Sequence, residues 1–199
     1  MIDIYIAELP KRSIEEPLDC DLRQREIDGI SNERFKHEKY YVWKLLECAA
    51  ERSFGIKASA IEFKKEESGR YVTDKFNFSL SHSGGVLAVA ISDTYIGVDV
   101  ERITDSHRSG LAKRYMTPCE YANYEKLSDE EKPRYFLKTW TAKEAVFKYS
   151  HKERFIPSDI DTLLSPCKTF EKSINQIGYF LSVAADSLNE LRIFEDVTL

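Results

Sequence analysis

The sequence lacks most features that mark disulfide frameworks, metal clusters and membrane spans. Its four cysteines are scattered at positions 20, 48, 119 and 167 and form no CxxC pair, which gives zinc and redox motifs little support. No apolar run approaches the roughly 18 residues that span a bilayer. The opening MIDIYIAELPKR has no basic segment ahead of its apolar residues, so we expect no signal peptide. Reduced cysteines and these absences favour a cytoplasmic protein with no membrane partner.

An excess of basic residues is also absent. The chain has 29 Lys and Arg against 34 Asp and Glu, a formal charge of −5, which argues against a nucleic-acid partner. Its 42% hydrophobic and 12% aromatic content excludes an intrinsically disordered chain. The 199 residues suffice for a hydrophobic core and allow one large domain or two halves of about 100 residues each.

Hydrophobic periodicity predicts an α+β protein. Period-two alternation and short apolar runs predict strands, and spacings of three and four predict helices. The expected strands cover 2–7, 76–80, 86–92, 96–100, 168–174, 179–185 and 191–197, and the expected helices cover 31–54, 111–127 with a break at Pro118, and 133–150. The layout suggests two similar halves, 1–102 and 103–199, which pack tightly because no Pro/Gly/Ser-rich linker separates them.

Two acidic residues, Asp99 and Glu101, stand two apart on the strand expected at 96–100. Side chains two apart on a strand point to one face. A pair of carboxylates beside Gly97 could therefore hold a hard cation such as Mg²⁺. Taken alone, this short pattern favours a plainer interpretation, a strand end with two solvated acids.

The helix expected at 133–150 carries Trp140, Glu144 and Lys148 at intervals of four, so the three side chains share one face. Glu144 could complete a metal site, and a neighbouring lysine could meet a phosphate. The alternative is an ordinary Glu–Lys pair on a helix surface, which adds little stability.

The strand expected at 76–80 runs into a small-residue turn, 81–85, with the sequence S-H-S-G-G. Backbone N–H groups, hydroxyls and the imidazole of His82 together suit a phosphate. A serine nucleophile with His82 as its base is disfavoured, because neighbours on a strand point to opposite faces and G-x-S-x-G is absent. A plain polar hairpin turn is the alternative. Basic residues that could serve an anionic ligand include Lys39 and Lys44 on the long helix, and Arg70 after Gly69.

The order of these motifs carries more information than any one of them. The chain runs N-F-S-L-S-H-S-G at 77–84, G-V-D-V-E at 97–101 and W-T-A-K-E-A-V-F-K at 140–148. This set closely resembles the Sfp-type 4′-phosphopantetheinyl transferases, whose signatures are S-H-S, G-[IV]-D-[IV]-E and W-x-x-K-E-[AS]-x-x-K. Arg70 stands where the family often has the lysine of a G-K-P element, with Tyr71 in place of the proline.

The resemblance implies a fold and a reaction. The fold would be two α+β halves in a pseudo-twofold arrangement, with coenzyme A as substrate in the cleft between them. The reaction would move 4′-phosphopantetheine from coenzyme A to a serine of an apo acyl or peptidyl carrier protein, releasing 3′,5′-ADP. We expect a monomer, because one chain can build the whole cleft.

The resemblance also implies roles for particular residues. Asp99, Glu101 and Glu144 look like ligands of Mg²⁺, with Mn²⁺ possible, and Glu144 holds the position also proposed as the general base. Lys148 looks like the catalytic lysine that meets the pyrophosphate. Further contacts to coenzyme A would come from Ser81, His82, Arg70, Lys143, Lys39 and Lys44.

The carrier protein would be recognised by the second half. The segment from Arg108 to Met116 combines Arg108, Lys113 and Arg114 with apolar residues, which suits an acidic carrier helix; a solvated helix face is the alternative. Two other functions stay open. One is a Mg²⁺-dependent phosphohydrolase that cleaves coenzyme A or another nucleotide without a protein acceptor, and the other is a non-catalytic module that binds coenzyme A or a carrier.

Overall fold

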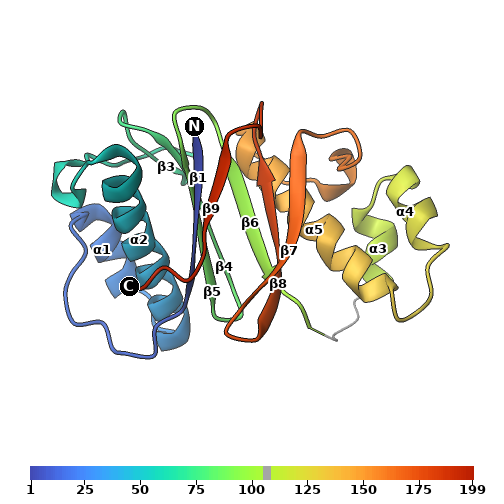
Figure 1. Ribbon diagram of the computed structural model, residues 1–199, viewed down its shortest axis with the longest axis horizontal. Coiled ribbons are helices and arrows are strands. Elements are labelled where there is room, and N and C mark those ends of the chain that lie inside the picture. Colours follow the sequence, from blue (N-terminus) through green and yellow to red (C-terminus); the bar gives the residue numbers. More distant parts are fainter. Residues whose placement is uncertain (105–108) are drawn as a thin grey trace.

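Two sheets lie between two long helices in the computed structural model, which describes residues 1–104 and 109–199 (Figure 1). The elements in chain order are β1 (Ile2–Glu8), α1 (Asp21–Asp28), α2 (Glu33–Phe54), η1 (Ala58–Ala60), β2 (Lys64–Lys65), β3 (Tyr71–Val72), β4 (Asn77–Ser83), β5 (Val86–Ser92), β6 (Gly97–Arg102), α3 (Ser109–Tyr115), α4 (Pro118–Tyr124), α5 (Lys132–Ser150), η2 (Pro157–Asp159), β7 (Cys167–Ile174), β8 (Ile177–Ala184) and β9 (Leu191–Phe194). The mixed α+β class expected from the sequence is confirmed.

The two main sheets share one connectivity. The first has the order β4-β5-β1-β9 and the second has the order β6-β8-β7. In the first sheet, β1 is followed by helix α2 and the β4–β5 hairpin, and β1 pairs antiparallel with β5. In the second, β6 is followed by helix α5 and the β7–β8 hairpin, and β6 pairs antiparallel with β8. Strand β9 returns to the first sheet and runs parallel to β1. The pseudo-twofold relation and the boundary at residue 102 stay predictions.

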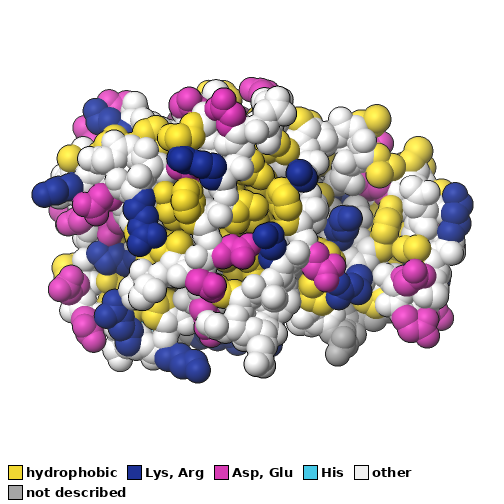
Figure 2. Space-filling model, in the orientation of Figure 1, with side chains coloured by type: hydrophobic (Ala, Val, Ile, Leu, Met, Phe, Trp, Pro, Cys, Tyr) yellow, Lys and Arg dark blue, Asp and Glu magenta, His cyan; other side chains and the backbone are white. Residues whose placement is uncertain are grey.

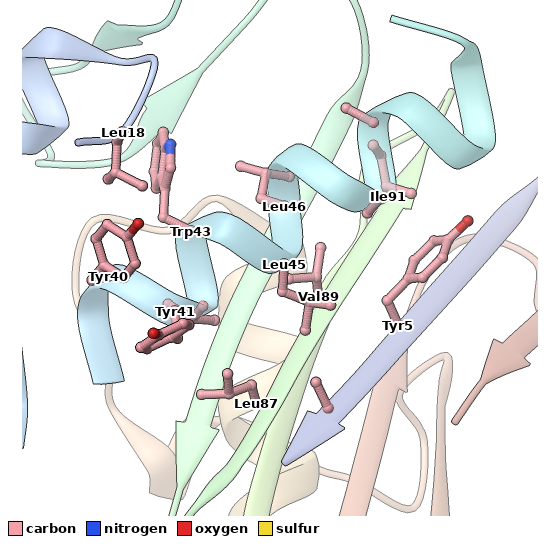
Figure 3. Packing of buried hydrophobic residues seen from close by; sticks show 14 of the residues in the cluster. Tyr5, Leu18, Tyr40, Tyr41, Trp43, Leu45, Leu46, Leu87, Val89 and Ile91 are labelled. Atoms are coloured by element: carbon pink, nitrogen blue, oxygen red, sulfur yellow. The ribbon is translucent and has the colours of Figure 1, made fainter. Parts of the chain in front are cut away.

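Helix α2 covers the outer face of the first sheet. Figure 3 shows Leu45 directed at Val89 of β5, inside a buried cluster that also contains Tyr5 of β1. The helix begins where the Asn32 side chain accepts the Phe35 backbone N–H, and it ends at a glycine in the left-handed conformation. The apolar periodicity of the sequence thus places the polar face of α2 away from this core.

A second core lies between the two sheets. It contains alternate residues of β1 and β5, such as Ile4 and Ala88, together with Val98 and Val100 of β6. Because side chains alternate along a strand, Asp99 and Glu101 point to the opposite face of β6 from Val98 and Val100. The inter-sheet core therefore fixes the direction of Asp99 and Glu101, as the sequence predicted.

Most expected elements are present, with shifted ends. The strand predicted to stop at Leu80 continues to Ser83, where Ser83 still pairs with Val86 of β5. His82 therefore lies on β4, and its placement in a turn was wrong, because the turn consists of two glycines with positive φ. Helix α1 and strand β3 were not predicted, and β9 ends at Phe194 rather than 197.

The surface mixes charges of both signs. On the face seen in Figure 2, Lys and Arg side chains alternate with Asp and Glu, and hydrophobic groups lie over the strands between them. Among the residues that the structure describes, no helix combines the length and the apolarity needed to cross a membrane.

Gly97 lets α5 approach β6 without a side chain between them. A Cβ at this position would lie 2.0 Å from the Ala145 carbonyl oxygen and 2.5 Å from the Tyr149 backbone nitrogen. We therefore expect Gly97→Ala to lower the free energy of unfolding by about 3 kcal/mol or more, through overpacking against backbone. Urea unfolding followed by circular dichroism measures this. Gly110→Ala is the control, because nothing lies within 4 Å of its added Cβ; equal losses for both variants would contradict the packing argument.

Candidate functional site

A row of serines joins the two sheets. Strands β4 and β6 are edge strands of their own sheets, so one side of each has no β-ladder partner. An unpaired buried backbone N–H is costly and needs another acceptor. Here serine hydroxyls of β4 accept the β6 N–H groups: Val98 to Ser79 at 3.0 Å, Val100 to Ser81 at 3.1 Å and Arg102 to Ser83 at 3.2 Å. We call Ser79, Ser81, Ser83 and these three N–H groups the serine seam.

The two acids of β6 lie along the serine seam. The Ser81 hydroxyl donates to Asp99 Oδ1 at 2.7 Å, and the Ser83 hydroxyl donates to Glu101 Oε2 at 2.5 Å. The second carboxylate oxygen of Asp99, Oδ2, is buried and has no hydrogen-bond partner. A buried carboxylate oxygen left in this way is an open position for a proton donor or a cation.

Lys148 reaches the same acids from α5. Its Nζ lies 2.7 Å from Asp99 Oδ1, 3.1 Å from the Val98 carbonyl oxygen and 3.3 Å from the Leu80 carbonyl oxygen. An ammonium group has three donors, so all of them have protein acceptors in this arrangement. Lys148 therefore ties α5 to both edge strands and places a positive charge against buried Asp99.

Glu144 lies one helical turn before Lys148, and the negative charges of Asp99 and Glu101 act on its carboxyl group. Its pKa is raised to about 7, first by burial and then by the negative charge of Asp99, with Glu101 adding to the rise and Lys148 opposing it. Three carboxylates crowded in this way repel one another, and a divalent cation between them would relieve the repulsion.

The donor set fits a hard divalent cation, although the ligands are not drawn together. Carboxylate oxygens are the ligands that Mg²⁺ and Mn²⁺ prefer, and the buried Oδ2 of Asp99 is open to one. Within residues 1–104 and 109–199, no three His, Cys, Asp or Glu side chains are close enough together to hold a metal ion. Lys148 supplies the positive charge beside Asp99 instead.

His82 projects from the other face of β4, toward α2. Its Nδ1 lies 3.3 Å from a carboxylate oxygen of Glu38. The pKa of His82 is lowered to about 4, first by burial and then by the positive charges of Lys39, Lys148 and Arg23, against a rise caused by Glu38. His82 is therefore neutral at pH 7 in the free protein.

A cavity of about 430 Å³ opens beside these groups and is rich in positive charge. We call it the cationic cavity. Burial lowers the pKa of both Lys39 and Arg70, and for Lys39 the neighbouring charges of Arg23 and Lys148 lower it as well. Arg70 also donates to the Lys148 carbonyl oxygen. Buried cations that repel each other in this way favour an anionic ligand. The lining includes Arg23, Lys39, Lys65, Arg70, Lys148 and Trp43, with Glu26, Glu66 and Glu153 among the acids.

A second cavity, of about 730 Å³, lies at the opposite end of β4. We call it the aromatic cavity. Ser83 and Glu101 line it, whereas Ser79 and Leu80 line the cationic cavity. The serine seam thus runs from one cavity to the other, with Ser81 between them. The aromatic cavity is also lined by Leu111, Tyr115, Phe136, Leu137 and Trp140.

Two lysines assigned to coenzyme A from the sequence lie elsewhere. Lys143 is 1% exposed; its Nζ is 2.6 Å from Glu120 and also donates to the carbonyl oxygens of Pro157 and Ile160. Lys44 pairs with Glu47 at 2.7 Å and lines a different cavity, on the far side of α2. The structure thus gives Lys143 and Lys44 partners outside the cationic cavity, because residues one and five positions from Glu144 and Lys39 point to other faces of their helices. That these two lysines contact coenzyme A stays a prediction.

Ser81 also differs from its expected role. Its hydroxyl has one hydrogen, which goes to Asp99, so it has none left to donate to a phosphate. Arg70, His82 and Lys39 do lie around the cationic cavity or beside it. Of the proposed carrier contact, Arg108 lies outside the described residues.

Sequence reasoning missed several partners of the site. Glu38 and Glu120 belong to no motif, and only the fold reveals that they face His82 and Lys143. Ser79 and Ser83 could have been found, because serine at every second residue of a strand forms a polar stripe along one face.

These features define a class of site before any relative is considered. Buried carboxylates lie between a cavity suited to an anion and a cavity suited to an apolar or aromatic group. Such a site has groups suited to an anion, to a divalent cation and to an apolar group.

Comparisons with known proteins find relatives of this chain. A family model described as the 4′-phosphopantetheinyl transferase superfamily matches residues 95–192. A 4′-phosphopantetheinyl transferase of Bacillus subtilis is 29% identical over 118 residues, covering 58% of this chain and 52% of that protein. HetI of Nostoc is 35% identical over 102 residues, covering 47% and 43%. Sfp of Bacillus subtilis strain 168 is 26% identical over 160 residues, covering 73% and 71%.

The matched stretch of the family model includes β6 and α5, which carry the three acids and Lys148. Over this stretch the chain is similar to the 4′-phosphopantetheinyl transferase superfamily. It spans about half the length of the first two of these relatives.

The ion pair of Lys143 and Glu120 predicts a structural effect. Lys143→Met would leave the fully buried Glu120 without its cation, and we expect a loss of about 3–5 kcal/mol in the free energy of unfolding. Adding Glu120→Leu should recover part of this loss, because no buried charge then lacks a partner. Urea unfolding measures both. Lys132→Met, at an exposed pair with Asp129, is the control and should change little. A Lys143→Met protein of normal stability would contradict the structural role.

The lowered pKa of His82 predicts a pH effect on stability. The pKa is about 4 in the folded protein and about 6.5 in an unfolded chain. The unfolded state therefore binds more protons between these values, so stability is complete above pH 6.5 and falls as the pH drops toward 4. Imidazole NMR signals should report a folded pKa near 4, and His82→Gln should lose less stability than the parent between pH 7 and pH 5. An NMR pKa near 6.5 would contradict this prediction.

Proposed function

We propose that this protein transfers the 4′-phosphopantetheine group of coenzyme A to a serine of an apo acyl or peptidyl carrier protein and releases 3′,5′-ADP. One observation carries the proposal. Asp99 and Glu101 accept hydrogen bonds from the serine seam between a cationic and an aromatic cavity, and their charges help to raise the pKa of Glu144.

The two cavities suit the two ends of coenzyme A. The phosphorylated adenosine would enter the cationic cavity, where Lys39 and Arg70 offer buried positive charge. A phosphate beside His82 would favour the imidazolium form and so raise its low pKa. The pantetheine arm would extend along the seam into the aromatic cavity, whose walls include Trp140 and Phe136.

Asp99, Glu101 and Glu144 would hold Mg²⁺, or Mn²⁺, between them. When bound, such a cation stabilises the charge that develops on pyrophosphate oxygens during phosphoryl transfer. Lys148 places its positive charge 2.7 Å from the carboxylate of buried Asp99. Its positive charge also lies where the pyrophosphate would pass from one cavity to the other.

Glu144 is the carboxylate placed to receive the proton of an incoming serine. It lies on the helical face that Trp140 shares, and Trp140 lines the aromatic cavity from which a carrier serine would approach. The proton would pass to a carboxylate oxygen of Glu144 directly or through one water. Lys113 and Arg114, in the last turn of α3, add positive charge beside Leu111 and Tyr115 of that cavity, which suits an acidic carrier helix.

Intact-mass spectrometry of apo carrier proteins tests the proposal. Carriers of the fatty-acid, polyketide and nonribosomal-peptide classes are each mixed with the protein, coenzyme A and Mg²⁺, with an EDTA control. We expect one carrier to gain a single phosphopantetheine only when the cation is present. Asp99→Asn should abolish the gain, since it removes the charge of a buried ligand. Asp74→Asn makes the same change at an exposed site and should leave transfer intact.

Two other outcomes would overturn the proposal. Cleavage of coenzyme A with no gain by any carrier would favour the phosphohydrolase. Binding of coenzyme A with neither cleavage nor transfer would favour a non-catalytic module.

A further inference from the structure

Two of the seam serines serve two partners at once. Ser81 accepts the Val100 N–H at 3.1 Å and donates to Asp99 at 2.7 Å. Ser83 accepts the Arg102 N–H at 3.2 Å and donates to Glu101 at 2.5 Å. Each hydroxyl therefore accepts a hydrogen bond from one backbone N–H of β6. It also donates one to the side-chain carboxylate of the residue that comes just before that N–H in the sequence. A hydroxyl has one hydrogen, so accepting the N–H leaves that hydrogen free to be directed at the acid.

Ser79 has the first of these contacts without the second. Its hydroxyl accepts the Val98 N–H at 3.0 Å, but the residue before Val98 is Gly97, which has no side chain. Ser79 thus supports the joining of the sheets in the same way as Ser81 while orienting no carboxylate. Ser79 is therefore an internal control that separates joining the two sheets from orienting a carboxylate.

The contacts to the acids restrict which oxygen faces a ligand. Asp99 Oδ1 receives hydrogen bonds from Ser81 and Lys148, whereas Oδ2 is buried and unpartnered. A carboxylate that rotated freely would cost entropy when it was fixed by a cation. Hydrogen bonds from surrounding residues orient metal ligands in advance, and their loss typically weakens metal binding 10- to 100-fold, as an order of magnitude.

We propose that Ser81 and Ser83 are positioning residues, which orient Asp99 and Glu101 toward a divalent cation by directing their hydroxyl hydrogens at those acids. This inference rests on the proposed function, since it assumes that the three acids hold the cation of that reaction. It departs from the role expected for Ser81, because the hydrogen that would bind a phosphate already binds Asp99.

Binding of Mn²⁺ tests the inference without measuring activity. Electron paramagnetic resonance follows free Mn²⁺ during a titration of the full chain, with and without coenzyme A, for the parent protein and the Ser79→Ala, Ser81→Ala and Ser83→Ala variants. We expect Ser81→Ala and Ser83→Ala to raise the Mn²⁺ dissociation constant by about tenfold. Ser79→Ala should leave that constant unchanged.

Thermal unfolding separates orientation from loss of structure. Ser79→Ala and Ser81→Ala each remove the acceptor of a buried N–H, so both should lower the melting temperature. Only Ser81→Ala should also weaken Mn²⁺ binding. Ser83 is half-buried, and Ser83→Thr keeps a hydroxyl, so this variant should have the Mn²⁺ affinity of the parent.

The inference fails if Ser79→Ala weakens Mn²⁺ binding as much as the other two substitutions do, or if none of the three changes it. It also fails if the parent binds no Mn²⁺ in either condition. Transfer to carriers, measured on the parent alone, distinguishes this failure from that of the proposed function. If the parent transfers nothing but Ser81→Ala and Ser83→Ala still weaken Mn²⁺ binding while Ser79→Ala does not, only the proposed transferase function is wrong. If the parent transfers normally but the three variants bind Mn²⁺ alike, only the positioning role is wrong.

Discussion

The structure depends on how two open sheet edges meet. Strands β4 and β6 each end a sheet, and unpaired backbone N–H groups at a buried edge would cost stability. The serine seam satisfies three of these groups with side-chain hydroxyls instead of a β-ladder. A ladder would have left no polar side chain between the strands. A row of hydroxyls places hydrogen-bond donors beside Asp99 and Glu101, so the same contacts that join the sheets also build the site.

Charge burial explains why two of the lysines of α5 have different roles. Lys143 and Lys148 are five residues apart, which places their side chains about 140° apart around the helix. Lys143 pairs with buried Glu120 and attaches α4 and the η2 loop to α5. Lys148 pairs with Asp99 at the seam. A buried pair adds little net stability but is costly to break, so each lysine fixes the orientation of the helix that carries Glu144.

The sequence allowed much of this arrangement to be predicted, but not all of it. Alternation placed Asp99 and Glu101 on one face, and helical spacing placed Glu144 with Lys148, because both are local properties of a single element. The roles of Lys143 and Ser81 required knowledge of which elements pack together. A motif shows that a lysine or serine is needed, but not whether its partner is a ligand or a distant residue such as Glu120. Helix α1 was missed because its only fully buried residue is Ile27, which leaves no apolar period to detect.

Electrostatics gives the site a reason to bind its ligands together. Burial raises the pKa of Glu144, and without a cation the acids raise it further. Burial also lowers the pKa of Lys39, and without an anion the cations of the neighbouring cavity lower it further. Each group is strained by neighbours of its own sign, and a ligand of opposite charge would relieve that strain. A divalent cation and a pyrophosphate would relieve both sets at once, since each also attracts the other. Binding of either should therefore strengthen binding of the other, a coupling that follows from the charges already buried around the serine seam.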